Sequence, residues 1–229
     1  MRILAVDTSA VCASCAVLED GRIRARSSTN AGLTHSRTLL PMVDALLQNS
    51  ETPLDSVDCF ACSVGPGSFT GIRIGIAAIK GLCDGTNKPA LAVSTLEGLA
   101  YNLLGQTVLA CAVMDARCEQ VYTALFRVEG ERVTRLTDDD AMKIADLGEK
   151  LRQYDAPIVF VGDGAEKCEQ ALGYPAAPPL LRFQSAASVA LCAERNFDES
   201  KLIAGKDLQP VYLRLPQAER ELRAKQNPK

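Results

Sequence analysis

The sequence is poor in the residues on which hydrolytic and metal-dependent sites are commonly built. Among its 229 residues there is one histidine, His35, and no tryptophan. A single histidine excludes the HExxH pair and every other metal site that needs several histidines. A Ser-His-Asp triad would have to pass through His35, which stands between Thr34 and Ser36 where a helix is expected to begin. Helix capping or interface packing therefore fits His35 better than catalysis, and no GxSxG nucleophile elbow is present.

Long apolar runs and an excess of positive charge are also lacking. No run of about 18 apolar residues occurs, and the N-terminus passes directly into a strand pattern without an apolar signal segment. These absences predict a cytoplasmic chain with no membrane partner. The net charge is −3 and the pI is about 5.3, whereas a protein whose main task is to grip nucleic acid is normally basic. We therefore expect any RNA contact to be local or to be supplied by a partner.

Length and composition place the chain among globular proteins. It is 47% hydrophobic and 23% charged, which is far too apolar for a disordered chain. A chain of 229 residues suits one large domain or two small ones.

Nine cysteines give an odd count that includes two CxxC spacings, Cys12/Cys15 and Cys59/Cys62. Zinc is one interpretation of such spacing. Both segments have strand patterns, and residues three apart on a strand face opposite sides of the sheet, so neither offers the turn of a metal knuckle. Buried free thiols that pack as small apolar groups explain the cysteines better, and we expect neither a metal nor a disulfide framework.

The segment 63–82, SVGPGSFTGIRIGIAAIKGL, predicts the end of a strand, a glycine-rich loop and a helix. Gly65, Gly67 and Gly71 allow a sharp turn or a close approach of the backbone. Ser68 can cap the helix, whose free N–H groups would favour an anion. No Gly-Lys-Ser/Thr follows the glycines, so the loop lacks the Walker lysine. A structural turn at an interface and a phosphate site both stay open.

The helix that follows this loop is apolar on two sides. One side carries Ile72, Ile76 and Ile79, and we expect it to cover the sheet of its own chain. The nearly opposite side carries small and apolar residues: Gly71, Ile74, Gly75, Ala78 and Leu82. This second side predicts either the close approach of a helix from another subunit or a central helix inside one large domain.

The segment 34–49 shows a similar surplus of apolar surface. Its arc of leucine, methionine and valine side chains spans roughly 160°, wider than one face against a sheet requires. Pro41 predicts a kink or a late helix start. The residues of this helix that we assign to a partner interface are His35, Leu39, Met42, Val43 and Leu46.

A repeated order of elements runs along the chain. The first run has strands at 3–7, 13–18 and 22–27, a helix at 34–49, a strand at 57–64, the helix ending near 82, a strand at 90–93 and a helix at 95–104. The second run has strands at 108–114, 120–127 and 132–136, a helix at 144–153, a strand at 158–161, a helix from 165 and another helix at 185–197. This approximate doubling of βββαβα predicts an α/β protein with mixed sheets flanked by helices.

The boundary between the two runs falls near residue 105. We expect an N-terminal subdomain at 1–104 and a C-terminal subdomain at 105–213. The tail, 214–229, is expected to pack back on the N-terminal subdomain. Residues 211–215, VYLRL, have a strand pattern, and 217–229 form a charged helix-like segment for which a solvated helix and a local RNA contact both stay open.

The duplicated halves resemble the plan of the actin/hexokinase/Hsp70-like (ASKHA) superfamily. Within it, segments spread over nearly the whole chain resemble the bacterial TsaB (YeaZ) family. These segments are 3–9 (ILAVDTS), 34–47 (THSRTLLPMVDALL), 63–82, 93–99 (VSTLEGL), 114–122 (MDARCEQVY) and 210–213 (PVYL).

The resemblance implies a function in making threonylcarbamoyladenosine, the modified base beside the anticodon of tRNAs that read codons starting with A. It implies a non-catalytic scaffold that binds a larger paralogue, the threonylcarbamoyl transferase TsaD, through a helical interface. It further implies that a small ATPase, TsaE, joins the complex, that the chain alone forms a homodimer through the same surface, and that tRNA is contacted indirectly or weakly.

The resemblance also implies a degenerate nucleotide cleft and no resident cofactor. Asp7 matches the first phosphate strand of the superfamily, and 162–165 (GDGA) match its adenosine turn, in which Asp163 adds an unfavourable charge. The vestigial nucleotide residues are therefore expected to be Asp7, Gly65, Gly67, Ser68, Gly162 and Gly164. The catalytic paralogue holds a metal with an HxxxH pair, which one histidine cannot supply.

Enzymatic alternatives remain open beside the scaffold. One is a small-molecule kinase or ATPase of the same superfamily, which does not depend on a Walker lysine. The other is a peptidase, a label that has been attached to relatives of this family, against which the single histidine speaks.

Overall fold

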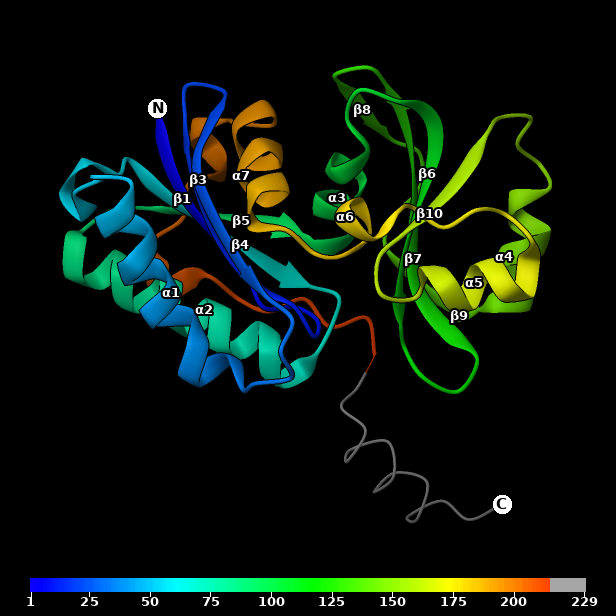
Figure 1. Ribbon diagram of the computed structural model, residues 1–229, viewed down its shortest axis with the longest axis horizontal. Helices are drawn as coiled ribbons and strands as arrows, with labels where there is room; N and C mark the ends of the chain where they lie inside the picture. The colour runs from blue at the N-terminus through cyan, green and yellow to red at the C-terminus, as the bar shows by residue number, and fades with distance from the viewer. Residues whose placement is uncertain (215–229) are drawn as a thin grey trace, which may run out of the picture.

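Two mixed β-sheets, each flanked by helices, form two lobes in the computed structural model, which describes residues 1–214 (Figure 1). The first sheet has the strand order β3-β2-β1-β4-β5. Its strands are β1 (Arg2–Asp7), β2 (Ala13–Glu19), β3 (Arg22–Thr29), β4 (Cys59–Gly65) and β5 (Ala90–Ser94). The second sheet has the order β10-β6-β7-β8, and β9 also pairs with β7. Its strands are β6 (Thr107–Asp115), β7 (Gln120–Glu129), β8 (Arg132–Arg135), β9 (Asp140–Lys143) and β10 (Ile158–Val161).

The helices lie on both faces of these sheets (Figure 1). They are α1 (His35–Asn49), α2 (Phe69–Thr86), α3 (Thr95–Ala100), α4 (Ile144–Leu151), α5 (Ala165–Leu172), α6 (Pro179–Arg182) and α7 (Ala186–Arg195). Four short 3₁₀ turns are at Leu54–Ser56, Tyr101–Leu103, Glu199–Lys201 and Gly205–Asp207. None of the helices within residues 1–214 has the length and apolarity needed to cross a membrane.

Four strands of each sheet share one topology, which confirms the duplicated plan, while β5 and β9 have no counterpart in the other sheet within residues 1–214. In the first lobe β1 pairs antiparallel with β2 and parallel with β4. In the second lobe β6 pairs antiparallel with β7 and parallel with β10. Each parallel strand is followed by a helix that crosses one face of its sheet, α2 after β4 and α5 after β10. The chain therefore has the α/β ASKHA fold, with β6, β7 and β10 as counterparts of β1, β2 and β4.

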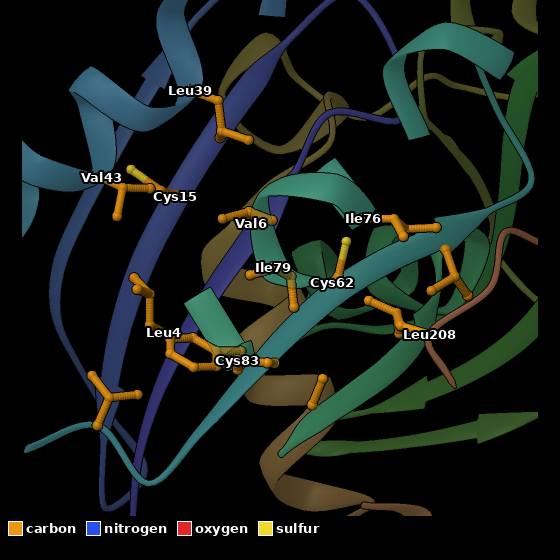
Figure 2. Close-up of a cluster of buried hydrophobic side chains, with 14 of the residues drawn as sticks. Leu4, Val6, Cys15, Leu39, Val43, Cys62, Ile76, Ile79, Cys83 and Leu208 are labelled. Carbon is orange, nitrogen blue, oxygen red and sulfur yellow. The ribbon is translucent and has the colours of Figure 1, made fainter. Parts of the chain in front are cut away.

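The core of the first lobe lies between its sheet and the pair α1–α2. Leu4 and Val6 of β1 meet Leu39 of α1 and Ile76 and Ile79 of α2 in this cluster (Figure 2). The alternate residues of β1, beginning with Ile3, face the other side and pack against α7. A central strand covered on both faces reads as a continuous apolar run, which is why ILAV carries no polar alternation.

Helix α7 lies outside the lobe that its sequence position predicts. It packs on β1 and β2 of the first sheet, although it follows the second run of elements. The expected unit 105–213 therefore does not coincide with the second lobe. Hydrophobic periodicity identified the helix but could not say which of two apolar sheet faces it covers.

Several other expectations are corrected by the structure. Residues 211–214 form no strand, and the one backbone bond that ties them to the first sheet runs from the N–H of Val211 to the carbonyl of Val64 (2.8 Å). Helix α1 begins at His35 and continues through Pro41, so of the two expected effects of this proline, a kink or a late start, the late start does not occur. β9 and α6 were not expected from the sequence, because both are only four residues long. The charged segment 217–229 lies outside the described residues.

The cysteines pack as apolar side chains. Eight are buried and Cys118 is exposed, and none is in a disulfide. Cys59 and Cys62 face opposite sides of β4, in different core clusters, as the strand geometry predicts. Burial raises the pKa of Cys15 to about 12 and that of Cys59 to about 11, so both are thiols at neutral pH. Within residues 1–214 no three His, Cys, Asp or Glu residues are grouped to hold a metal ion.

Candidate functional site

A cleft of about 590 Å³ lies between the two lobes. It opens at the carboxyl ends of β1, β4, β6 and β10, where ligands of open α/β sheets are usually bound. Its walls are the loops after these strands together with the C-terminal segment: residues 9–11, 66–70, 114–117, Tyr122, Asp163 and 211–214. The duplicated topology therefore places equivalent loops of the two lobes face to face.

Two aspartates end the central strands of the two sheets and form the same turn. The Oδ1 atom of Asp7 accepts the backbone N–H of Ser9 at 2.8 Å. The Oδ1 atom of Asp115 accepts the backbone N–H of Arg117 at the same distance. Such a turn, in which an aspartate accepts the N–H two residues further on, reverses a chain that leaves a strand. Sequence reasoning missed Asp115, although its place at the end of the second repeat matches that of Asp7.

Asp7 is sealed beneath the cleft rather than lining it. Its side chain is 2% exposed, and it accepts hydrogen bonds from the hydroxyls of Ser9 (2.7 Å) and Ser63 (2.6 Å) as well as the N–H of Ser9. Burial raises the pKa of Asp7, and these hydrogen bonds oppose the rise. A carboxylate whose oxygens are already engaged has little capacity for a metal–phosphate group.

The glycines after β4 and β10 permit close backbone packing. A Cβ atom at Gly65 would collide with the carbonyl of Val211, and one at Gly67 with the carbonyl of Ser9. In the second lobe a Cβ atom at Gly162 would collide with the carbonyl of Val113. Gly65 and Gly162 also adopt φ angles of +128° and +121°, which favour glycine. These residues and Gly164, which packs on the backbone of 113–115, have a structural role, and only Gly67 lines the cleft.

Ser68 forms the N-cap of α2, as expected. Its Oγ atom accepts the N–H of Gly71 at 3.2 Å, and its own N–H donates to the carbonyl of Ser9 at 2.7 Å. It lines the cleft beside Phe69, the first residue of the helix.

Two aspartates, Asp115 and Asp163, line the second-lobe wall of the cleft, together with Arg117. Burial raises the pKa of Asp163 to about 6, and the neighbouring Asp115 adds to the rise, while the amide of Gln184 (3.4 Å) opposes it. Asp163 is therefore mostly ionised at neutral pH. The two carboxylates disfavour the phosphates of a nucleotide, whereas Arg117 on the same wall has the opposite effect.

His35 is not paired with a nucleophile among the described residues. Its Nε2 atom lies 2.7 Å from the carbonyl oxygen of Ala10, so this nitrogen carries the proton. Within residues 1–214 no hydroxyl or thiol is hydrogen-bonded to the ring. His35 ties the start of α1 to the loop after β1.

Several residues assigned to the partner interface lie inside their own lobe. Leu39, Val43 and Leu46 are 1%, 3% and 5% exposed in the core cluster of the first lobe. Gly71 and Gly75 pack on the loop after β1, where Cβ atoms would overlap the backbone carbonyl and the hydroxyl of Thr8. The sequence showed that these faces are apolar, but the loop after β1 and the sheet already cover them.

The surface that remains on α1 and α2 is mixed: charged residues such as Arg37, Asp44 and Asp84 are exposed on it beside apolar ones. His35, Met42, Ile74, Ala78 and Leu82 are half-buried. A stripe of small residues on the outer side of α2 is exposed: Ala77, Gly81 and Gly85. Leu33, just before α1, and Leu40 are each 52% exposed. The spacing of four residues between Ala77, Gly81 and Gly85 is visible in the sequence. Once the isoleucines of α2 are assigned to the inner side, this spacing identifies the outer side.

Comparisons with known proteins agree on one group of relatives. The family model for "TsaD: tRNA N6-adenosine threonylcarbamoyltransferase" matches residues 29–219. The chain is 31% identical to the tRNA threonylcarbamoyladenosine biosynthesis protein TsaB of Bacillus subtilis, over 96% of both chains. It is 33% identical to the protein of the same name from Escherichia coli, over 93% of this chain and 95% of that protein.

Solved structures give the same grouping. YeaZ from Pseudomonas aeruginosa superposes with a TM-score of 0.77 at 27% identity, covering 93% of this chain and 99% of that one. Component A of (R)-2-hydroxyglutaryl-CoA dehydratase from Acidaminococcus fermentans has a TM-score of 0.51 at 13% identity, over 84% of this chain and 96% of that one, and shares the fold alone.

Proposed function

The chain belongs to the TsaB (YeaZ) family and has a role in threonylcarbamoyladenosine biosynthesis, and we propose that it serves there as a non-catalytic scaffold. In this proposal it binds and activates a TsaD-type transferase that modifies tRNAs reading codons that start with A. The observation that carries the proposal is the exposed stripe of small residues on α2, Ala77, Gly81 and Gly85, which no part of residues 1–214 covers.

The outer side of α2 has the composition of a helix-packing surface. Ala77, Gly81 and Gly85 are exposed at a spacing of four residues, and no heavy atom lies within 4 Å of a Cβ built at Gly81 or Gly85. Small side chains allow a second helix to approach closely, and half-buried Ile74 and Ala78 beside them add apolar area. A transferase of the same fold would dock here, and a second copy of the chain would use the same surface when it is alone.

The residues of this chain support a subunit that does not itself catalyse the transfer reaction. One histidine cannot form the HxxxH metal pair that the family resemblance assigns to the transferase. The strand-end aspartate Asp7 is committed to Ser9 and Ser63. The proposal therefore places catalysis on the transferase, with a TsaE-type ATPase joining the complex, tRNA contacted indirectly or weakly, and the assembly acting in the cytoplasm.

An ATPase or kinase is the second candidate, because the cleft is large enough for a nucleotide. Its volume of about 590 Å³ falls within the range of small-molecule sites, roughly 300–1,000 Å³. The carboxylates of Asp115 and Asp163 on one wall oppose this candidate. Turnover of ATP by the isolated chain, abolished by Asp7→Ala, would favour it over the scaffold.

A peptidase has less support. His35 is the sole histidine of the sequence, and its contact with the carbonyl of Ala10 leaves no base paired to a nucleophile among the described residues. Burial raises the pKa values of Cys15 and Cys62, so these two thiols are not thiolate nucleophiles at neutral pH.

The test is a reconstituted modification reaction with and without this chain. It contains tRNA, threonine, bicarbonate, ATP and the purified partner enzymes, and threonylcarbamoyladenosine is measured by nucleoside mass spectrometry. We expect product only when the chain is present, with Asp7→Asn giving wild-type yield.

Ala77→Glu is the informative variant, because it places a charge on the proposed docking surface without entering the core. Loss of product with this variant, while Ala171→Glu on the exposed side of α5 remains active, supports docking through α2. Equal product without the chain would refute the scaffold role.

A further inference from the structure

The C-terminal segment Val211–Arg214 crosses from the first lobe to the second at the mouth of the cleft. In Figure 1 the red stretch that ends at residue 214 runs from the lobe of α2 toward the other lobe. The segment lines the cleft with all four of its residues.

The first end of the segment is held on the glycine loop. The N–H of Val211 donates to the carbonyl of Val64 at 2.8 Å. Its own carbonyl oxygen occupies the space where Gly65 has no side chain. Any residue larger than glycine at position 65 would therefore push the segment off β4.

The middle of the segment is held by an aromatic and cationic stack. The ring of Tyr212 lies on that of Phe69 with centroids 4.7 Å apart and an interplanar angle of 26°. The guanidinium of Arg73 sits 3.8 Å from the centroid of Phe69, and its Nε atom donates to the hydroxyl of Tyr212 at 2.8 Å. Tyr212 thus covers the first residue of α2 and engages the arginine one turn later.

The far end of the segment reaches the second lobe. The Nη1 atom of Arg214 donates to the carbonyl of Ala116 at 3.2 Å, in the loop after β6. Val211 and Tyr212 remain 45% and 37% exposed, so the segment lies on the surface and can leave without opening either core.

We propose that Val211–Arg214 is a releasable strap that links the two lobes across the mouth of the cleft and limits how far they separate. The strap joins the glycine loop of one lobe to the loop after β6 of the other, and these loops are the two walls of the cleft. Closure of two lobes around a central cleft is a common form of domain motion. Here the element that links the lobes is Val211–Arg214, so a ligand or partner that displaces these four residues would control how far the lobes can separate.

The chain carries its own reporter for this motion. Met114 lines the cleft, is 2% exposed, and would contact a Cβ at Gly67 across the lobes at 3.1 Å. Met142 belongs to the core side of β9 in the second lobe, away from the cleft lining. Hydrogen peroxide oxidises an accessible methionine, so the ratio of the two oxidation rates reports opening of the cleft separately from unfolding.

The experiment compares the full chain with Tyr212→Ala and Arg214→Ala, using peroxide oxidation read by peptide mass spectrometry. We expect the rate at Met114 to rise on the order of tenfold in each variant while that at Met142 is unchanged, because each strap contact has a modest strength. Tyr212→Phe, which keeps the ring stack and loses the hydroxyl, should give a smaller rise. Arg152→Ala, an exposed arginine distant from the cleft lining, is the matched control and should behave as the unaltered chain.

An unchanged Met114 rate in both alanine variants overturns the proposal. Equal rises at Met114 and Met142 mean that the substitutions unfold the chain; Tyr212→Phe then decides, since a selective rise at Met114 supports the strap and no rise refutes it. The isolated chain suffices for this experiment, so its result is independent of the scaffold role.

Discussion

The two lobes share a topology but differ in the outer faces of their helix pairs. In the first lobe α1 and α2 have 15 and 18 residues, and the outer side of α2 is Ala77, Gly81 and Gly85. In the second lobe α4 and α5 have eight residues each, and their exposed positions include Glu149, Glu166 and Glu169. The outer side of α2 thus carries a stripe of small residues, whereas the corresponding helices of the second lobe expose glutamates. Because the fold requires neither, the difference points to a partner for the first lobe alone.

The strand-end loops give a second contrast within the same repeat. Asp7 and Asp115 make identical turns, yet Asp7 is 2% exposed, whereas the side chain of Asp115 is 44% exposed on the cleft. Lys167 lies 3.8 Å from Asp115 and 3.1 Å from Glu119, at the exposed edge of the second lobe. In the first lobe the strand-end aspartate is an internal hydrogen-bond acceptor, whereas in the second lobe the equivalent Asp115 stays at the surface.

The largest expected effect comes from placing one charge on each helix face. Ala77→Glu should weaken self-association and transferase binding on the order of a hundredfold or more, because burying an unpaired carboxylate costs about 3–5 kcal/mol. Ala171→Glu makes the same change on exposed α5 and should have no effect. Sedimentation and titration calorimetry measure both variants. Equal loss from the two would remove the distinction between the lobes.

A smaller effect, on the free energy of unfolding, is expected to distinguish the inner from the outer glycines of α2. Gly71→Ala should lower the free energy of unfolding by about 2–3 kcal/mol, because its Cβ overlaps the carbonyl of Thr8. Gly81→Ala has open space and should raise that free energy by about 0.5–1 kcal/mol through helix propensity. Urea denaturation of both variants is the measurement. If Gly71→Ala proved neutral, the packing of Thr8 against α2 would have to be reconsidered.

The raised pKa of Asp163, in the second lobe, predicts that the stability of the folded chain depends on pH. Its pKa in the folded chain is about 6, above the ordinary 3.8, so the folded chain binds the proton more tightly than the unfolded chain. The corresponding stability is complete below about pH 4 and is lost as the pH rises through 6. Asp163→Asn should remove this slope and raise the free energy of unfolding at pH 7 by on the order of 2 kcal/mol. The exposed Asp155→Asn is the control, and a slope that persists in Asp163→Asn would assign it to another group.

The smallest effect is expected at the lone histidine of the first lobe. His35→Ala removes the bond to the carbonyl of Ala10 and should cost about 1 kcal/mol of unfolding free energy. Yield in the reconstituted reaction should stay near that of the unaltered chain at saturating partner concentration. Loss of product with the complex still assembled would instead reveal a catalytic role for His35.

The local chemistry of the chain was already present in its sequence. The apolar run 3–6, the cap at Ser68 and the alternation of strands and helices determined the elements and their duplicated order, because these depend on residues close in the chain. The opposite facing of Cys59 and Cys62 follows from the period of a strand in the same way. The family resemblance also rested on such local motifs.

Contacts between distant segments were decided only by the tertiary structure. Periodicity showed that α2 has two apolar sides. In the structure Gly71 and Gly75 pack against Thr8 and therefore face inward. Ala77 and Gly81 are exposed on the outer side. The same holds for α7 on the first sheet and for Tyr212 on Phe69, since residues far apart in the sequence leave no local pattern that names their partner. The sequence determined which surfaces are apolar, and the folded chain decided which of them it covers itself.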